Sequence, residues 1–275
     1  DNIYTWDETS LTILLNKKFD IAINLDKEEE ACILLYNVKA QKKYGFTWKN
    51  NHIAPATKAA EHKLLTGFFD HISQKNTKHY LEEIFEICHL DFQNEPYLIN
   101  YNKQLALKWK TKIKELADHK TVVGLNTGCG NRWPTRLWPE ERWIELIKLL
   151  MNNNYFPLLL GGPQEEERNK FLSEKTNSYY PGTFSLEEFF AITDACDIIV
   201  TQVSMMLHIA IALKKKIVLM NNIFNKHEFY LYNNGVIVEP ETGCDCFYGN
   251  TCKRERPCMY DIKAETIYNE ITKLS

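Results

Sequence analysis

The sequence predicts an α/β protein whose second half is a Rossmann-like domain with a parallel sheet. After about residue 120, short apolar segments alternate with helical patterns, and glycines follow two of these segments. Apolar strands that alternate with helices in this way are typical of βαβ units. Hydrophobic residues make up 44% of the 275 residues, so the chain can bury a large core.

The second half contains the expected elements in a regular order. Strands are predicted over residues 122–126, 156–160, 197–201, 217–220 and 236–238. Helices are predicted over residues 140–151, 164–175, 204–213 and, at the end of the chain, 259–275. One more helix is expected to begin at Ser185, because Glu188 follows it at the spacing of a capping box.

The first hundred residues predict a less complete domain. One buried strand is expected over residues 19–25, and helices are expected over residues 27–38, 56–72 and 77–88. One strand is too few for a complete doubly wound sheet. With a linker at 94–102 and a helix at 103–117, the expected domains are residues 1–102, 103–258 and a C-terminal helix at 259–275.

Composition excludes two classes of protein. The 33 basic and 36 acidic residues give a net charge of −3, which disfavours a nucleic-acid binder. No apolar run reaches the roughly 18 residues that a membrane span needs. We therefore expect neither nucleic acid as a partner nor a transmembrane segment.

The glycine-rich stretch after the first strand of the second half predicts a phosphate-binding loop. Five of the 11 glycines fall within residues 124–162. The carboxyl ends of strands in an open parallel sheet face the ligand crevice. Small residues there let backbone N–H groups approach a phosphate, Thr127 adds a hydroxyl, and Arg132 and Arg136 carry charges suited to a diphosphate. The alternative is an ordinary loop with two solvated arginines.

Two other strand ends carry candidate ligand groups. Ser204 is expected at a helix N-terminus, where the N–H groups of Met205 and Met206 favour an anion. His208, one turn later, is either a core histidine or a donor contact.

The second strand end is followed by Gly161 and Gly162. Glu165 or Glu166 next to them would accept hydrogen bonds from a ribose, or would simply be acidic residues at a solvated helix start.

Four of the eight cysteines lie within 15 residues near the C-terminus. They are Cys244, Cys246, Cys252 and Cys258. Four thiols this close in sequence are compatible with a structural zinc or iron site, with reduced packed thiols, or with one or two disulfides.

An ordered set of motifs connects the chain to a known family. They are Asn126-Thr127-Gly128-Cys129-Gly130, Trp133-Pro134-Thr135-Arg136-Leu137-Trp138-Pro139, Leu159-Leu160-Gly161-Gly162-Pro163, Asp197-Ile198-Ile199-Val200-Thr201, Leu207-His208-Ile209-Ala210 and Phe19-Asp20-Ile21-Ala22-Ile23-Asn24-Leu25-Asp26. In this order they resemble glycosyltransferase family 9, the heptosyltransferases of lipopolysaccharide assembly and their relatives.

The resemblance implies the GT-B fold, two facing Rossmann-like domains with parallel sheets, of which the N-terminal one is incomplete here. It implies inverting transfer of a heptose or related sugar from a nucleotide donor, ADP in the heptosyltransferases, to a lipopolysaccharide-core or other glycan or protein acceptor. No metal is required for that chemistry. The implied location is the cytoplasm, with the inner membrane surface as an alternative site of contact.

Three departures from the family pattern affect the expected site. The family's first strand and Gly-Asp loop, which supplies its catalytic Asp, have no counterpart before Asp1, so the catalytic residue is unassigned and Asp26 is the candidate. Arg136 stands where the motif usually has Lys. Val203 stands where an acidic residue is usual.

Two other functions stay open at this stage. A nucleotide- or nucleotide-sugar-binding module without turnover is compatible with these departures. A sugar-nucleotide epimerase is disfavoured, because no G-x-G-x-x-G follows a predicted strand.

Overall fold

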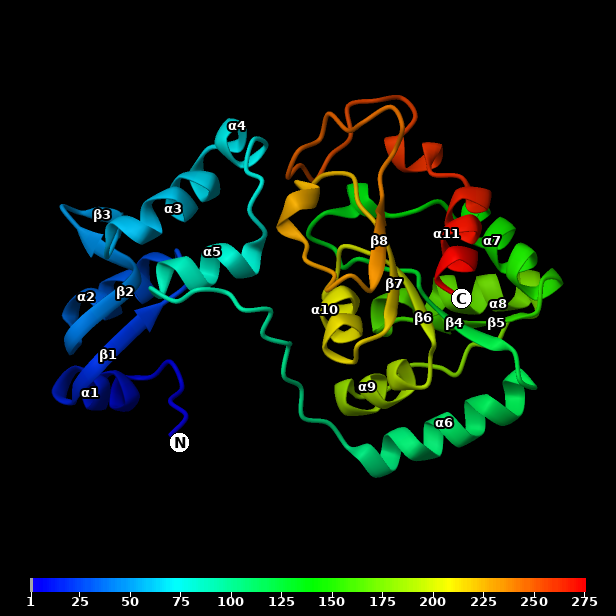
Figure 1. Ribbon diagram of the computed structural model, residues 1–275, viewed down its shortest axis with the longest axis horizontal. Helices are drawn as coiled ribbons and strands as arrows, with labels where there is room; N and C mark the ends of the chain where they lie inside the picture. The colour runs from blue at the N-terminus through cyan, green and yellow to red at the C-terminus, as the bar shows by residue number, and fades with distance from the viewer. Residues whose placement is uncertain (1) are drawn as a thin grey trace. The chain divides into compact units, whose positions relative to one another are not determined.

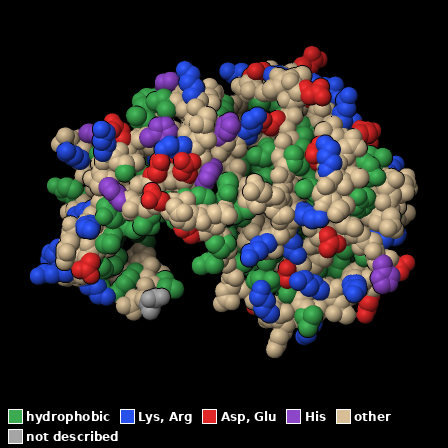
Figure 2. All heavy atoms as spheres, viewed as in Figure 1, with side chains coloured by type: hydrophobic (Ala, Val, Ile, Leu, Met, Phe, Trp, Pro, Cys, Tyr) green, Lys and Arg blue, Asp and Glu red, His purple; other side chains and the backbone are tan. Residues whose placement is uncertain are grey.

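The computed structural model describes residues 2–275, and the chain divides into two compact units. Unit 1 comprises Asp1–Glu95 with His227–Tyr230, and unit 2 comprises Pro96–Lys226 with Leu231–Ser275. The division of the C-terminal part at residue 258 stays a prediction. No helix in the described range is long and apolar enough to cross a membrane. Basic and acidic side chains alternate over the face shown in Figure 2.

Unit 1 is a three-stranded sheet with short helices, shown in blue and cyan in Figure 1. The strands are β1 (Lys18–Asn24), β2 (Lys39–Lys49) and β3 (His52–Pro55). The helices are α1 (Glu8–Asn16), α2 (Glu29–Asn37), α3 (Glu61–Phe68), α4 (Asp70–Ser73) and α5 (Tyr80–Ile87). Strand β1 pairs in parallel with β2, as expected for this fold, and β3 pairs antiparallel to β2.

Three features of unit 1 correct the expectations. Strands β2 and β3 and helix α1 were not predicted. For β2 the reason is that the strand is rich in lysine and buried only around Phe46. The antiparallel β3 departs from an all-parallel sheet. The helix expected over 56–72 is broken at Phe69, whose extended backbone separates α3 from α4.

Unit 2 confirms the predicted alternation of strands and helices (Figure 1). Its strands are β4 (Thr121–Asn126), β5 (Tyr155–Leu160), β6 (Ile198–Gln202), β7 (Lys216–Met220) and β8 (Gly235–Val238). Its helices are α6 (Lys103–Ala117), α7 (Glu140–Asn152), α8 (Glu166–Thr176), α9 (Leu186–Asp194), α10 (Met205–Ala212) and α11 (Ala264–Leu274). The Ser185 hydroxyl accepts the N–H of Glu188 at 3.3 Å, which confirms the predicted helix start.

All five strands of unit 2 run parallel, in the order β5-β4-β6-β7-β8. The chain therefore reverses its winding between β4 and β6. Asn126 at the end of β4 pairs with Leu160 of β5 and Thr201 of β6. In open sheets of this type, ligands bind at the carboxyl ends of the strands beside such a switch point.

A large apolar core holds these strand ends in place. Trp138 and Trp143 pack edge to face, with ring centroids 4.8 Å apart, in a cluster that includes residues of α7, α11 and the sheet. Both indoles are essentially inaccessible to solvent. Because such cores are densely packed, the loops that leave the sheet start from fixed positions.

Candidate functional site

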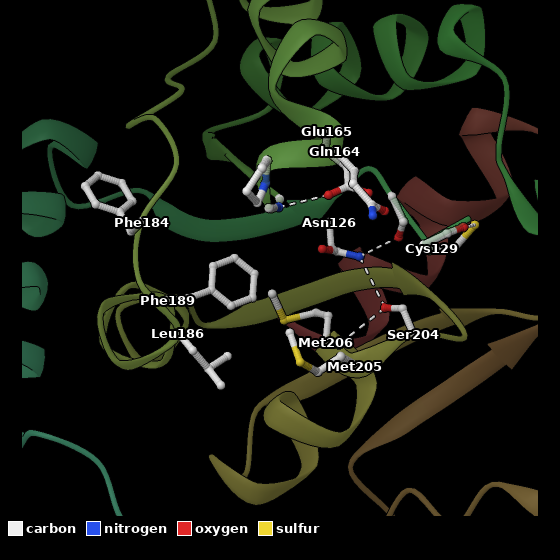
Figure 3. A pocket seen from close by; sticks show the side chains of 15 residues that line it. Asn126, Cys129, Gln164, Glu165, Phe184, Leu186, Phe189, Ser204, Met205 and Met206 are labelled. Atoms are coloured by element: carbon white, nitrogen blue, oxygen red, sulfur yellow. Dashed lines mark hydrogen bonds between the residues drawn. The ribbon is translucent and has the colours of Figure 1, made fainter. Parts of the chain in front are cut away.

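A cavity of about 510 Å³ opens in unit 2 at the switch point of the sheet. It is formed by the loops that follow β4, β5 and β6 together with the start of α9 (Figure 3). Predicted and unpredicted residues line it: Asn126, Gly128, Cys129, Gly130, Gly161, Gly162, Pro163, Gln164, Glu165, Phe184, Leu186, Phe189, Ser204, Met205 and Met206.

Asn126 connects two of these loops. Its side-chain amide donates to the carbonyl oxygen of Gly128 at 2.8 Å, to Thr201 Oγ1 at 3.1 Å and to Ser204 Oγ at 3.3 Å. Two of these contacts appear as dashed lines in Figure 3. Gln202 is fully buried, and its amide, in the orientation that satisfies its neighbours, donates to the carbonyl oxygens of Gly128 and Asn126 at 3.1 Å. The loop after β4 is therefore held from behind by buried amides.

The side chain of Glu165 packs closely against glycines of the two neighbouring loops. Its Oε2 accepts the N–H of Gly162 at 2.9 Å. A Cβ on Gly128 would lie 1.9 Å from Glu165 Oε1, and a Cβ on Gly161 would lie 2.6 Å from Glu165 Cβ. Glycine at both positions lets the carboxylate lie against the loop, and this accounts for two of the five glycines of the cluster.

Several backbone N–H groups at the cavity have no acceptor among the residues that the structure describes. Among residues 2–275, the N–H groups of Cys129, Gly130 and Ser204 donate to no other protein group. Ser204 is the N-cap of α10, and its hydroxyl accepts the N–H of Met206 at 3.3 Å. Free N–H groups that converge on a concave surface at a helix N-terminus favour an anionic ligand.

Arg136 lies behind this wall and does not line the cavity. Its side chain is 6% exposed, and its guanidinium donates to the carbonyl oxygens of Trp133, Cys129 and Val203. Within the described part of the chain no carboxylate pairs with it. Burial lowers the pKa of Arg136 from its ordinary value. An arginine nevertheless stays charged in proteins, so the wall carries an uncompensated positive charge.

Aromatic rings take the place of a carboxylate around this guanidinium. Its carbon lies 5.4 Å from the ring centroid of Trp133 and 5.6 Å from that of Phe224. The two rings meet edge to face at 5.3 Å. Cation–π contacts of this kind stabilise a desolvated cation without neutralising it.

One side of the cavity is apolar and was not predicted. Phe184, Leu186 and Phe189, at and before the start of α9, stand opposite the polar loops (Figure 3). Met205 adds a side chain that is 57% exposed. One signal was present in the pattern, since Phe184 and Leu186 flank the predicted capping residue, but nothing indicated that this helix start turns toward the cavity.

Several predicted donor residues lie elsewhere. Thr127 is fully buried, and its hydroxyl donates to Asn169 Oδ1 at 2.6 Å. Arg132 is exposed and stacks on Trp133 at 4.3 Å. Glu166 forms an ion pair with Lys170 at 2.6 Å on α8.

His208 is not a core residue. Its side chain is exposed, its ring stacks on Tyr97 with centroids 6.0 Å apart, and its Nδ1 lies 3.4 Å from the Tyr97 hydroxyl.

Asp26, the candidate for catalysis, follows β1 in unit 1. Its Oδ1 accepts the N–H of Glu28 at 3.0 Å, next to the start of α2. Its own N–H donates to Asn24 Oδ1 at 3.0 Å. The carboxylate is exposed, and a capping role accounts for the contacts it makes within unit 1.

The cysteine segment gives no support for the predicted metal site. Cys244, Cys246, Cys252 and Cys258 are free cysteines, and in the described range no group of three or more Cys, His, Asp or Glu side chains is arranged to hold a metal. Cys244 contacts Cys246 and Cys258, and Cys246 contacts Cys252. The choice between a structural metal and reduced, packed thiols stays a prediction.

Comparison with known proteins identifies the family. The sequence profile described as "Glycosyltransferase family 9 (heptosyltransferase)" matches residues 11–237. This chain belongs to that family. Over 110 residues it is 28% identical to lipopolysaccharide heptosyltransferase 2 of Salmonella typhimurium, a match that spans 38% of this chain and 31% of that protein.

Solved structures of family members share the fold. A family 9 glycosyltransferase from Veillonella parvula superposes with a TM-score of 0.69 and 20% identity, over 97% of this chain and 78% of that one. The ADP-heptose lipopolysaccharide heptosyltransferase II of E. coli gives 0.63 and 16%, over 97% and 79%. An E. coli heptosyltransferase solved with ADP-2-deoxy-2-fluoro heptose gives 0.57 and 17%, over 98% and 76%. This chain therefore has the GT-B type of α/β fold.

Proposed function

We propose that this family 9 glycosyltransferase transfers a heptose or related sugar, with inversion, from an ADP-linked donor to a lipopolysaccharide-core or other glycan acceptor. The observation that carries the proposal is the cavity at the switch point of unit 2. Free backbone N–H groups and an apolar wall line it, and an uncompensated arginine lies buried behind it. A nucleoside diphosphate sugar has the matching parts, a dianionic diphosphate and a flat base.

The donor would lie across the cavity with its diphosphate at the loop after β4. The N–H groups of Gly130 and Ser204 would bind the phosphate oxygens, and Glu165 would accept hydrogen bonds from the ribose. The base would pack on the apolar wall of Phe184 and Phe189 (Figure 3). The related E. coli enzyme solved with an ADP-sugar analogue supports the choice of nucleotide.

The reaction would break the bond between the anomeric carbon and the diphosphate oxygen. An acceptor hydroxyl attacks that carbon from the opposite face and forms the new glycosidic bond, and a carboxylate takes the hydroxyl proton. Negative charge grows on the leaving diphosphate, so N–H donors fixed in advance at this position lower the barrier. Asp26 stays the candidate for the carboxylate. Contact with a lipid-linked acceptor at the inner membrane surface is part of the same proposal.

A binding and turnover assay tests the proposal. The chain is titrated with ADP, GDP and UDP by calorimetry, and it is then incubated with ADP-heptose and a heptose-accepting glycan while free ADP is measured. We expect selective binding of ADP and acceptor-dependent ADP release. Absence of nucleotide binding would contradict the proposal. Binding without release would favour the alternative of a nucleotide-binding module.

A single substitution checks the orientation of the donor. Glu165→Gln should weaken both ADP and adenosine about fivefold to tenfold, because a ribose hydroxyl then loses a charged acceptor. Glu167→Gln is the matched control, since Glu167 is an exposed carboxylate two residues further along α8. Equal affinities of the Glu165 variant and the control would place the ribose elsewhere.

A further inference from the structure

We infer that Arg136 acts on the bound donor through two peptide groups rather than by touching it: its guanidinium orients the peptide units 129–130 and 203–204 so that their N–H groups point into the cavity. This rests on the proposed function, because it concerns how the diphosphate site of that function is built. Arg136 is thus a positioning residue.

Arg136 fixes the direction of two carbonyl groups. The two terminal nitrogens of Arg136 donate to the carbonyl oxygens of Cys129 and Val203, which belong to loops after different strands. Its Nε donates to the carbonyl oxygen of Trp133 at 3.2 Å. One buried side chain therefore fixes two peptide planes that are 74 residues apart in the sequence, 203 less 129.

The geometry of the peptide bond then sets the direction of the N–H groups that follow these carbonyls. No peptide bond in the described chain is cis. In a trans peptide the C=O of one residue and the N–H of the next point in opposite directions. Because the carbonyls of Cys129 and Val203 point at Arg136, the N–H groups of Gly130 and Ser204 point away from it. Both residues line the cavity, and neither N–H has an acceptor within residues 2–275.

The positive charge of Arg136 also strengthens these N–H groups as donors. A hydrogen bond from a cation to a carbonyl polarises the peptide unit and strengthens the N–H on its other side as a donor. Arg136 thus transmits its positive charge to both N–H groups while staying buried itself. Its aromatic neighbours, Trp133 and Phe224, leave that charge unneutralised.

The buried amides complete the same construction. The carbonyl of Gly128 accepts hydrogen bonds from Asn126 and Gln202, so the N–H of Cys129 is turned the opposite way in turn. Three neighbouring N–H groups, of Cys129, Gly130 and Ser204, are then held by buried side chains, of which Arg136 and Gln202 do not line the cavity. This arrangement differs from a loop that wraps around a phosphate only when the phosphate binds, because its donors are preorganised.

The test separates a direct charge contact from a positioning role. Arg136→Lys keeps the positive charge, but a single ammonium cannot span two carbonyls in the way of the planar guanidinium fork. We expect Arg136→Lys to weaken ADP about 10- to 100-fold, the range for bonds to charged groups, and to leave adenosine unchanged. Arg142→Lys, on α7 and bonded to Glu145, is the control.

A spectroscopic measurement in the ligand-free protein keeps the test independent of catalysis. Amide resonances of Gly130 and Ser204 should shift in Arg136→Lys and stay in place in Arg142→Lys. In Arg136→Ala, added ethylguanidinium should restore both the resonances and the ADP affinity. If Arg136→Lys binds ADP like the unaltered protein, or if the two amides do not move, the inference is wrong.

The two levels of the proposal fail in different ways. If the unaltered protein binds no nucleoside diphosphate, the proposed function fails, while the amide shifts still decide how Arg136 is connected. If ADP binds and neither the affinity nor the amides respond to Arg136, the function stands and the positioning role falls.

Discussion

The glycine-rich loop and the cysteine segment are both compositional clusters, yet only one of them forms a candidate site. The loop at 126–130 meets residues from two other strand ends around a common cavity. The segment at 244–258 holds four free thiols that contact one another in pairs, and no group of three or more metal-ligating side chains was found among the described residues. The difference lies in where the fold places each cluster. The first stands at the switch point of a parallel sheet, and the second follows the edge strand β8.

The cysteine segment still contributes to the loop, through its backbone. The carbonyl oxygen of Tyr248 accepts the indole N–H of Trp133 at 3.1 Å, and that of Gly249 accepts the hydroxyl of Thr135 at 2.8 Å. These contacts support the turn that carries Arg136. The segment therefore supports the site by its course, and its thiols are not what connects it to the cavity.

The largest effect should come from removing the hydrogen bonds that the side-chain amide of Asn126 donates. Asn126→Asp replaces an N–H₂ donor by a carboxylate that faces the carbonyl of Gly128 and two hydroxyls. We expect a loss of about 3 kcal/mol in the free energy of unfolding and a large loss of ADP affinity, because a buried acceptor loses its donor. Urea denaturation and calorimetry measure the two. Asn153→Asp, an exposed residue on a comparable carbonyl contact, should change neither by more than about 0.5 kcal/mol.

The stability of the protein at alkaline pH should depend on the buried thiol of Cys196. Burial raises the pKa of Cys196 to about 12, against 9.0 for the free side chain. The raised folded-state pKa stabilises the protein fully below pH 9, and the contribution is lost as the pH rises toward 12. Over that interval the unfolding free energy should fall by about 1.4 kcal/mol per pH unit for this thiol. Chemical denaturation of the protein and of Cys196→Ala at pH 8 to 10.5 measures the difference in slope, and equal slopes would contradict the assignment.

A smaller effect is expected from filling the space beside Glu165. Gly128→Ala places a methyl group where Glu165 Oε1 lies, so the carboxylate must turn away and lose the N–H of Gly162. The cost should be about 1 kcal/mol. Thermal and urea unfolding measure it. In a Glu165→Ala background the same substitution should cost almost nothing, and additive costs would show that the two residues do not interact.

The smallest effect, a change near zero, is expected for metal removal. With no group of cysteine, histidine or acidic side chains in the described range arranged around an ion, a chelator should leave the melting temperature unchanged to within about 1 °C. Differential scanning fluorimetry with and without a chelator under reducing conditions checks this. A clear drop would mean that the cysteine segment gathers around a metal in solution, and the contrast with the loop would disappear.

Most of unit 2 was predictable because local pattern and tertiary burial agree there. Strand β6 is buried on both faces and begins with the apolar run Ile198, Ile199 and Val200, so pattern and burial give the same signal there. Strand β2 in unit 1 is the opposite case. Its lysines at 39, 42 and 43 are typical of a solvated segment, and only pairing with β1 and β3 makes it a strand.

The candidate site was predictable where it depends on strand ends. Gly128, Gly161 and Ser204 follow the ends of three strands that lie side by side, and the βαβ pattern implies that such ends meet on one edge of the sheet. Phe184 and Phe189 could not be found in this way, because the turn before α9 is not tied to a strand end. The choice between Glu165 and Glu166 was also beyond the sequence, since neighbouring helical residues differ by about 100° in direction.

The class of fold, the family and the strand ends around which a ligand can gather follow from the sequence, because periodicity and ordered motifs are local properties. The role of each charged or polar group became visible in the folded structure alone. Arg136 is a short step from the loop in sequence, yet its bonds to Cys129 and Val203 put it behind the cavity wall. The physical reason is that hydrogen-bond partners and burial depend on residues brought together from distant segments, which no local pattern contains.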